Sequence, residues 1–343
     1  MKRLFSGSIA AIGVLIAVVV VRTLMHQPPA ATNTNLVDIE LNEAALAERL
    51  SQSIQFQTVS FQSPELKNQS QFTAFIDWVH TSYPRVHESL DYIQLNDTML
   101  YRWQGSDSSL QPILVTGHYD VVPVIPGSES QWQQPPFSGA IVDGLIWGRG
   151  ALDDKSGVLG ILEAVTYLLD AGHQPKRTVY LSFGHDEEIG GPEGAAAVAA
   201  YLKDQGVQLA WSLDEGSFIF DGLIAGVDSL VAAINVAEKG SVTLDIVAAA
   251  EGGHSSMPPQ TSAITDLARA ITQLEENPLP GGLEGLSADM FDRISRYMPF
   301  VPRMFFANQW LFGGLIDDQL SATPTTNAML RTTTAPTMLS GSV

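Results

Sequence analysis

Four short clusters of histidine and acidic residues are the groups most capable of chemistry. Each follows or borders a run of apolar residues. Carboxylates gathered in one place repel each other, so they need a cation or raised pKa values to be stable together. The chain has no cysteine, which leaves imidazole and carboxylate as candidate ligands; zinc is the first choice, and cobalt or manganese are possible. The clusters lie at 117–120, 148–155, 184–188 and 213–216.

Each cluster by itself has a simpler structural explanation. His118 and Asp120 form a common loop pattern, and Asp153 has the residue type of a helix N-cap. Adjacent glutamates such as Glu187 and Glu188 usually lie on solvated faces. The combination of four clusters in one chain, rather than any single one, indicates a metal site.

The elements around the clusters alternate between strand and helix patterns. Apolar runs predict buried strands at 112–116 and 178–183, and a third strand at 209–213. Helical periodicity predicts helices over 158–169 and 193–203. This alternation is typical of an α/β domain with a mainly parallel central sheet. Active sites of such sheets gather beyond the carboxyl ends of the strands, so we expect the clusters to converge in one crevice.

The pattern changes after about residue 235. Apolar and polar residues alternate over 242–246, which predicts a half-exposed strand. An apolar stripe over 264–274 predicts a helix that ends at Asn277-Pro278. We therefore expect a smaller inserted α+β domain over 235–343.

The N-terminal segment is basic and contains an apolar run from Leu4 to Val21. A signal anchor is the favoured interpretation of 1–25, with a cleaved signal peptide or a buried core helix as alternatives. Residues 26–40 are expected to form a tether. Basic residues before the run predict that the body lies on the exported side, attached to the membrane, or secreted if the segment is cleaved.

Composition narrows the function classes. The 343 residues carry a net charge of −19, so a nucleic-acid binder, which needs a basic face, is excluded. Hydrophobic residues make up 45 % and charged residues only 16 %, which excludes a disordered chain.

Three stretches resemble the M20 family of zinc metallopeptidases, within it the carboxypeptidase S and N-acyl-amino-acid hydrolase branch. They are 132–139, 144–155 and 327–334. The resemblance implies a zinc-exopeptidase-like catalytic domain over 41–234 and a dimerisation or lid domain after it, with a homodimer as the implied assembly. It implies hydrolysis of an amide bond in small peptides or N-acyl amino acids.

The resemblance also implies a ligand set for two zinc ions. His118 and Glu215 would bind one ion, Glu188 the other, and Asp153 would bridge both. In the family the peptide bond after Asp153 is usually cis.

Three further residues receive roles from the same resemblance. Glu187 would be the general base, and Asp120 would orient His118. His254 would hydrogen-bond the developing oxyanion, often in the site of a partner subunit. Arg331 is a candidate for holding a substrate carboxylate, although a surface role fits it equally.

One element of the family pattern is missing. The last zinc ligand in the family is a histidine near the C-terminus, whereas the last histidine here is His254. We therefore expect an incomplete chain, or a shortened variant with a substitute ligand. The alternative to an enzyme is a non-catalytic, membrane-tethered binding protein or an inactive fragment on the same scaffold.

Overall fold

The computed structural model describes residues 2–30, 39–222, 227 and 229–341. The chain divides into two compact units. We call residues 36–216 the sheet unit, and residues 1–35 with 217–343 the helical unit. Each unit is described by itself.

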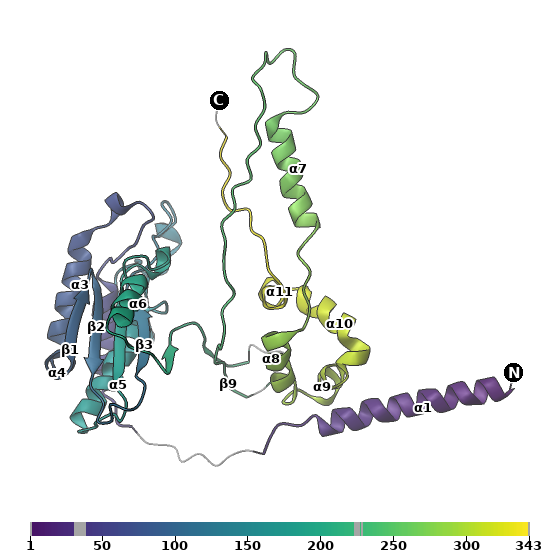
Figure 1. Ribbon diagram of the computed structural model, residues 1–343, viewed down its shortest axis with the longest axis horizontal. Coiled ribbons are helices and arrows are strands. Elements are labelled where there is room, and N and C mark those ends of the chain that lie inside the picture. Colours follow the sequence, from purple (N-terminus) through teal and green to yellow (C-terminus); the bar gives the residue numbers. More distant parts are fainter. Residues whose placement is uncertain (1, 31–38, 223–226, 228, 342–343) are drawn as a thin grey trace. The chain divides into compact units, whose positions relative to one another are not determined.

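A five-stranded sheet forms the centre of the sheet unit (Figure 1). Its strand order is β1 (Asp91–Leu95), β2 (Thr98–Trp103), β6 (Val179–Gly184), β3 (Ile113–His118) and β7 (Trp211–Leu213). The strands β6, β3 and β7 are parallel, as the sequence predicts, whereas β1 and β2 add an antiparallel hairpin. The sheet is therefore mixed, and its parallel part carries the acidic clusters.

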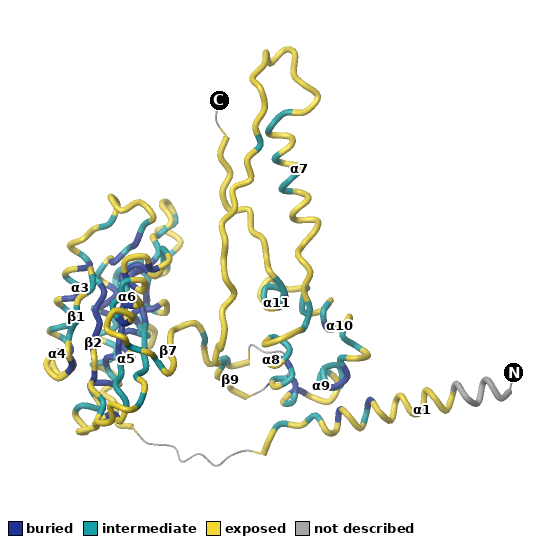
Figure 2. The backbone as a smooth tube through the Cα atoms, viewed as in Figure 1, coloured by how far each residue is buried: buried dark blue, intermediate teal, exposed yellow. Residues whose placement is uncertain are grey.

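Helices cover both faces of this sheet. Side chains of α3 (Gln69–Ser82), α4 (Pro84–Ser89) and α5 (Lys155–Asp170) share one apolar core with β2, β3 and β6. On the opposite face α6 (Ala195–Asp204) packs on Leu100 and Tyr180. Figure 2 shows the buried residues concentrated in these layers. Burial on both faces explains why β6 is a nearly continuous apolar run rather than an alternating one, whereas the residues of β7 are exposed.

Shorter elements complete the sheet unit. The helix α2 (Glu43–Ile54) packs on α5, where Arg49 Nη2 donates to Glu163 Oε2 at 2.8 Å. A small hairpin precedes α5, and three short 3₁₀ helices lie in loops. These are β4 (Ile141–Val142), β5 (Leu145–Ile146), η1 (Pro64–Leu66), η2 (Glu129–Gln131) and η3 (Glu187–Ile189).

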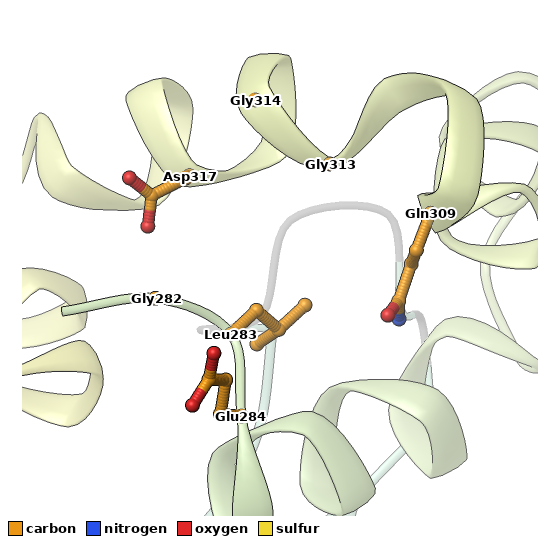
Figure 3. Close-up of a pocket in the computed structure, with 7 residues that line it drawn as sticks. All are labelled: Gly282, Leu283, Glu284, Gln309, Gly313, Gly314 and Asp317. Atoms are coloured by element: carbon orange, nitrogen blue, oxygen red, sulfur yellow. The ribbon is translucent and has the colours of Figure 1, made fainter.

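The helical unit consists of helices joined by long extended segments. Residues 282–284 and four residues of the helix over 309–321 line a hollow of about 310 Å³ (Figure 3). The elements are α1 (Lys2–Met25), β8 (Ile219–Phe220), β9 (Val231–Ala232), α7 (Ala263–Glu276), α8 (Gly285–Ser295), α9 (Phe300–Ala307), α10 (Gln309–Ser321) and α11 (Pro324–Leu330). The helix predicted over 264–274 is therefore confirmed as α7.

The strand predicted at 242–246 does not form. Val242 and Leu244 are 78 % and 76 % exposed, and the segment has no strand assignment. Alternation makes a strand only where a neighbour accepts its backbone hydrogen bonds. No described residue pairs with this segment in a ladder.

The N-terminal apolar run forms a helix, but its predicted role as a membrane anchor is not supported. Within the described part of the chain, none of the helices combines the length and apolar character needed to cross a membrane. The C-terminal end of α1 instead contacts α9, where Arg22 Nε donates to the Ala307 carbonyl at 3.1 Å. The exported location of the body stays a prediction.

Candidate metal centre

The acidic clusters meet at the carboxyl ends of the parallel strands. His118 ends β3, which lies between β6 and β7 in the sheet. Its Nε2 atom lies 3.0 Å from Asp153 Oδ1, 3.2 Å from Glu215 Oε1 and 3.7 Å from Glu187 Oε2. The predicted convergence is therefore confirmed, because one imidazole contacts residues from the other three clusters.

The arrangement fits a metal cation. Two sets of three residues have ligand atoms within 4.8 Å of one another: His118 with Glu187 and Glu215, and His118 with Asp153 and Glu188. One imidazole and several carboxylates are a donor set that suits zinc, and also cobalt or manganese. The side chain of His118 is 2 % exposed, whereas that of Asp153 is 67 % exposed. The inner end of the site is therefore buried, and its outer end is open to solvent.

Asp120 organises two of the converging loops. Its side chain is fully buried. One oxygen lies 3.3 Å from Nδ1 of His118, and the carboxylate also accepts hydrogen bonds from the backbone N–H groups of Glu187 (3.1 Å) and Glu188 (3.2 Å). The hydroxyl of Ser60 donates a further short hydrogen bond to Asp120. The carboxylate of Asp120 therefore orients the imidazole of His118 and also fixes the backbone of Glu187 and Glu188.

Asp154, the neighbour of Asp153, points into the protein instead of toward solvent. It is the N-cap of α5 and accepts a hydrogen bond from Gly157 N at 3.2 Å, while its other oxygen accepts one from His118 N at 3.3 Å. A Cβ atom on Gly117 would lie 2.7 Å from that second oxygen, so glycine is needed there for the close approach. The Asp153-Asp154 peptide bond is cis, as the resemblance implies.

Electrostatics at the site are dominated by His118 and its acidic neighbours. Burial lowers the pKa of His118, but the hydrogen bond and charge of Asp120, with the charges of Glu215 and Glu187, outweigh it and raise the pKa to about 10. Without a metal the imidazole therefore holds a proton that a metal ion must displace.

The pKa values of the carboxyl groups are raised, as expected where acidic groups are crowded together. Burial, together with neighbouring carboxylates, raises the pKa of Glu215 to about 7 and that of Asp154 to about 6. The pKa values of Glu187 and Glu188 are also raised, first by burial and then by adjacent acidic groups. Burial and mutual repulsion therefore disfavour the charged forms of these groups, and a bound cation would relieve that cost.

Two residues of the third cluster have structural partners. Nδ1 of His185 lies 2.8 Å from the hydroxyl of Thr98, and Asp186 accepts hydrogen bonds from the N–H groups of Glu193 (2.7 Å) and Gly194 (3.2 Å). They hold the turn that carries Glu187 and Glu188.

Two residues with predicted roles lie in the helical unit. His254 is exposed, and its Nδ1 accepts hydrogen bonds from Ser256 N and Oγ. Arg331 Nη2 donates to Ser321 Oγ at 2.7 Å and lies 3.8 Å from Asp317 Oδ2. The catalytic role of His254 stays a prediction.

Three residues without a role in the family resemblance support the site. They are Ser60, Asp154 and Lys155. Asp154 and Lys155 carry a signal, because they directly follow a candidate ligand at the start of a predicted helix. Ser60 has no such signal, because its partner Asp120 is 60 positions away.

Comparison with known proteins agrees with the geometry. Residues 114–305 match the sequence profile described as "Peptidase family M20/M25/M40". The chain is 40 % identical to "N-fatty-acyl-amino acid synthase/hydrolase PM20D1" of Xenopus tropicalis, covering 100 % of this chain and 68 % of that protein. It is also 40 % identical to "Probable carboxypeptidase S-like 2" of Dictyostelium discoideum, covering 89 % of this chain and 58 % of that protein. The chain thus spans about three fifths to two thirds of these relatives.

Carboxypeptidase S of Saccharomyces cerevisiae is 38 % identical over 59 % of this chain and 35 % of that protein. Among solved structures, human carnosine dipeptidase 1 matches with a TM-score of 0.42 and 20 % identity, covering 52 % of this chain and 39 % of that one. These comparisons give no support to the predicted homodimer or membrane attachment. The matched profile covers more than half of the chain and includes all four acidic clusters completely, so the chain belongs to peptidase family M20.

Proposed function

We propose that this chain carries the metal centre of a zinc-dependent hydrolase that cleaves an amide bond in small peptides or N-acyl amino acids. The observation that carries the proposal is the convergence of Asp153, Glu187, Glu188 and Glu215 on the single imidazole of His118. This many carboxylates around one buried histidine require a cation for stability.

The ligand assignment follows the distance of each carboxylate from the imidazole of His118. Asp153 and Glu215 approach Nε2 of His118 more closely than Glu187 does, so we assign them as ligands together with His118. Glu188 completes the second set. Zinc bound there would supply Lewis acidity, which polarises a carbonyl group and lowers the pKa of water.

Glu187 is left as the general base. Its Oε2 atom is 3.7 Å from His118 Nε2 and its side chain is 56 % exposed, so it faces the mouth of the site where water and substrate arrive. A carboxylate that is free of metal can take a proton from water and deliver it to the departing nitrogen. Its backbone N–H, held by Asp120, keeps the side chain at this position.

The substrate class comes from the names of the relatives. One group is described as N-fatty-acyl-amino acid synthase/hydrolase and the other as carboxypeptidase S or similar to it. Substrates of both descriptions have an amide bond next to a free carboxylate. We therefore propose that class, with peptides and N-acyl amino acids as the two members to compare.

Metal content and turnover test the proposal together. The full chain is purified, its zinc is measured, and hydrolysis of a dipeptide and of an N-acyl amino acid is followed before and after chelation. We expect bound zinc and hydrolysis that chelation abolishes and added zinc restores. A folded chain that binds no zinc and hydrolyses neither substrate would overturn the proposal in favour of a non-catalytic binding protein.

A further inference from the structure

The most deeply buried basic side chain of the sheet unit has no role in the chemistry proposed above. Lys155 is 0 % exposed and occupies the first position of α5, two residues after Asp153. Its Nζ donates to the backbone carbonyls of Ser53 at 2.9 Å and Phe56 at 2.7 Å. A fully buried lysine is rare unless its charge has a specific partner, and here the hydrogen-bond partners are carbonyls at the end of α2.

Those carbonyls belong to a segment that reaches the metal centre from the other side. Beyond α2, the chain runs along the end of β3, where the hydroxyl of Thr58 donates to the Tyr119 carbonyl at 2.6 Å. Two residues later the hydroxyl of Ser60 donates to Asp120. Residues 53–60 therefore connect the ammonium of Lys155 to the carboxylate that orients His118.

The contacts close into a ring. From Lys155 the ring passes through residues 53–60 to Asp120, and from Asp120 to His118. The backbone N–H of His118 then donates to Asp154, which adjoins Lys155 in the chain. The stem of Lys155 also lies beneath the loop before Asp153, since a Cβ atom on Gly150 would be 3.2 Å from its Cδ atom.

We propose that Lys155 is a positioning residue that holds the ligand loops of Asp153 and His118 at metal-binding separation before the metal arrives. This inference rests on the proposed metal centre. The ammonium touches no ligand, and it acts through residues 53–60 and Asp120. Removing it takes one donor from each of the Ser53 and Phe56 carbonyls, which keep their backbone N–H partners, and frees one side of the ring.

The test compares two contacts between the same pair of helices. Lys155→Met removes the contact at the metal end of α2 and α5. Arg49→Met removes the Arg49–Glu163 ion pair, whose glutamate lies eight residues further along α5, about 12 Å away. Both variants lose a link between α2 and α5, but only the first opens the ring.

Zinc affinity is measured by competition with a chelator. A residue that only stabilised the fold would lower the Tm without a specific loss of zinc affinity. We expect Lys155→Met to weaken zinc binding about 10–100-fold, the range for outer partners of metal ligands. Arg49→Met is expected to lower the Tm while leaving zinc affinity within about twofold of the parent, because the ligand loops are untouched.

If Lys155→Met does not fold, Lys155→Gln is used as the second variant. The glutamine amide is one bond shorter than the lysine side chain and cannot bridge both carbonyls, so weaker zinc binding is again expected. A folded Lys155 variant that binds zinc as tightly as the parent would overturn the inference, as would an equal loss of affinity in Arg49→Met. A parent chain that binds no zinc would instead refute the proposed function.

Discussion

Two segments that both carry strand patterns have opposite fates in this molecule. Residues 113–118 form β3, which pairs with β6 on one side and β7 on the other. Residues 242–246 remain exposed and have no strand assignment. The comparison teaches that an apolar pattern specifies which face a strand would bury, while a neighbouring strand decides whether it forms.

The largest expected effect concerns the chemistry at the end of β6. Glu187→Gln is expected to lower turnover about 10²–10⁴-fold while zinc content is retained, because the amide cannot accept the proton of water. Glu193→Gln is the matched control, since this exposed glutamate of the same turn makes its contacts to Asp186 and Asn96 through the backbone. Zinc analysis and steady-state kinetics check both variants. Turnover close to the parent value in Glu187→Gln would show that another group is the base.

Core substitutions probe the contrast between the two segments directly. Leu162 is 0 % exposed and packs in the core of the sheet unit, so Leu162→Ala is expected to lower the free energy of unfolding by about 2–5 kcal/mol. Leu244 is 76 % exposed, so Leu244→Ala is expected to lower the free energy of unfolding by less than about 0.5 kcal/mol. Urea denaturation measures both values. A large cost at Leu244 would mean that 242–246 is packed in solution, and the comparison would fail.

The acidity of the metal centre predicts how zinc stabilises the sheet unit. Without metal, the pKa of Glu215, about 7, lies above its ordinary value of 4.5, so its contribution to stability is complete below pH 4.5 and is lost as pH rises through 7. For His118, with a pKa of about 10 against 6.5, the contribution is complete below pH 6.5 and is lost as pH rises through 10.

Zinc competes with both protons, so the gain in Tm from zinc should be larger at pH 8 than at pH 5.5. Thermal unfolding with saturating zinc and with a chelator at the two pH values measures this. An equal gain at both values would argue against metal binding at these two groups.

The smallest effect is expected at a histidine pair far from the metal centre in sequence. The rings of His80 and His87 stack at 3.9 Å, and burial followed by the neighbouring His87 lowers the pKa of His80 below 6.5. The stability that His80 provides is therefore present above pH 6.5 and is lost as pH falls below it.

His80→Phe keeps a ring in the stack and should reduce the fall in Tm between pH 7.5 and 5.5 by about 2 °C. His173→Phe, at an exposed histidine, is the control and should leave the fall unchanged. An unaltered pH dependence in His80→Phe would assign the acid sensitivity to other groups.

Much of the sheet unit could be predicted from local pattern. The strands β3, β6 and β7 and the helices α5 and α6 are periodic or continuous apolar segments, and their ends identify where the clusters meet. The hairpin of β1 and β2 was not predicted. Its turn at Asn96 uses a positive φ of 53°, and its pairing with β6 joins residues about 80 positions apart.

The candidate ligands could be named from the sequence, but the residues that hold those ligands in place could not. Asp153 and Asp154 are identical in type and adjacent, and only burial shows that Asp153 faces the open site while Asp154 caps α5 and holds His118. Ser60 and Lys155 act through hydrogen bonds across 60 and about 100 residues. No local pattern encodes such partners, because they depend on how the loops pack.

The ring through Lys155 and residues 53–60 has a consequence for protein design. A designer who transplanted this centre to another scaffold would naturally copy the five side chains that face the metal. The host would then lack the buried segment that keeps Asp120 in place and the ammonium that holds that segment. The smallest transferable unit is therefore the end of α2, residues 53–60 and the first turn of α5 together with the ligand loops, so that a graft without them would bind metal only after its loops reorganised.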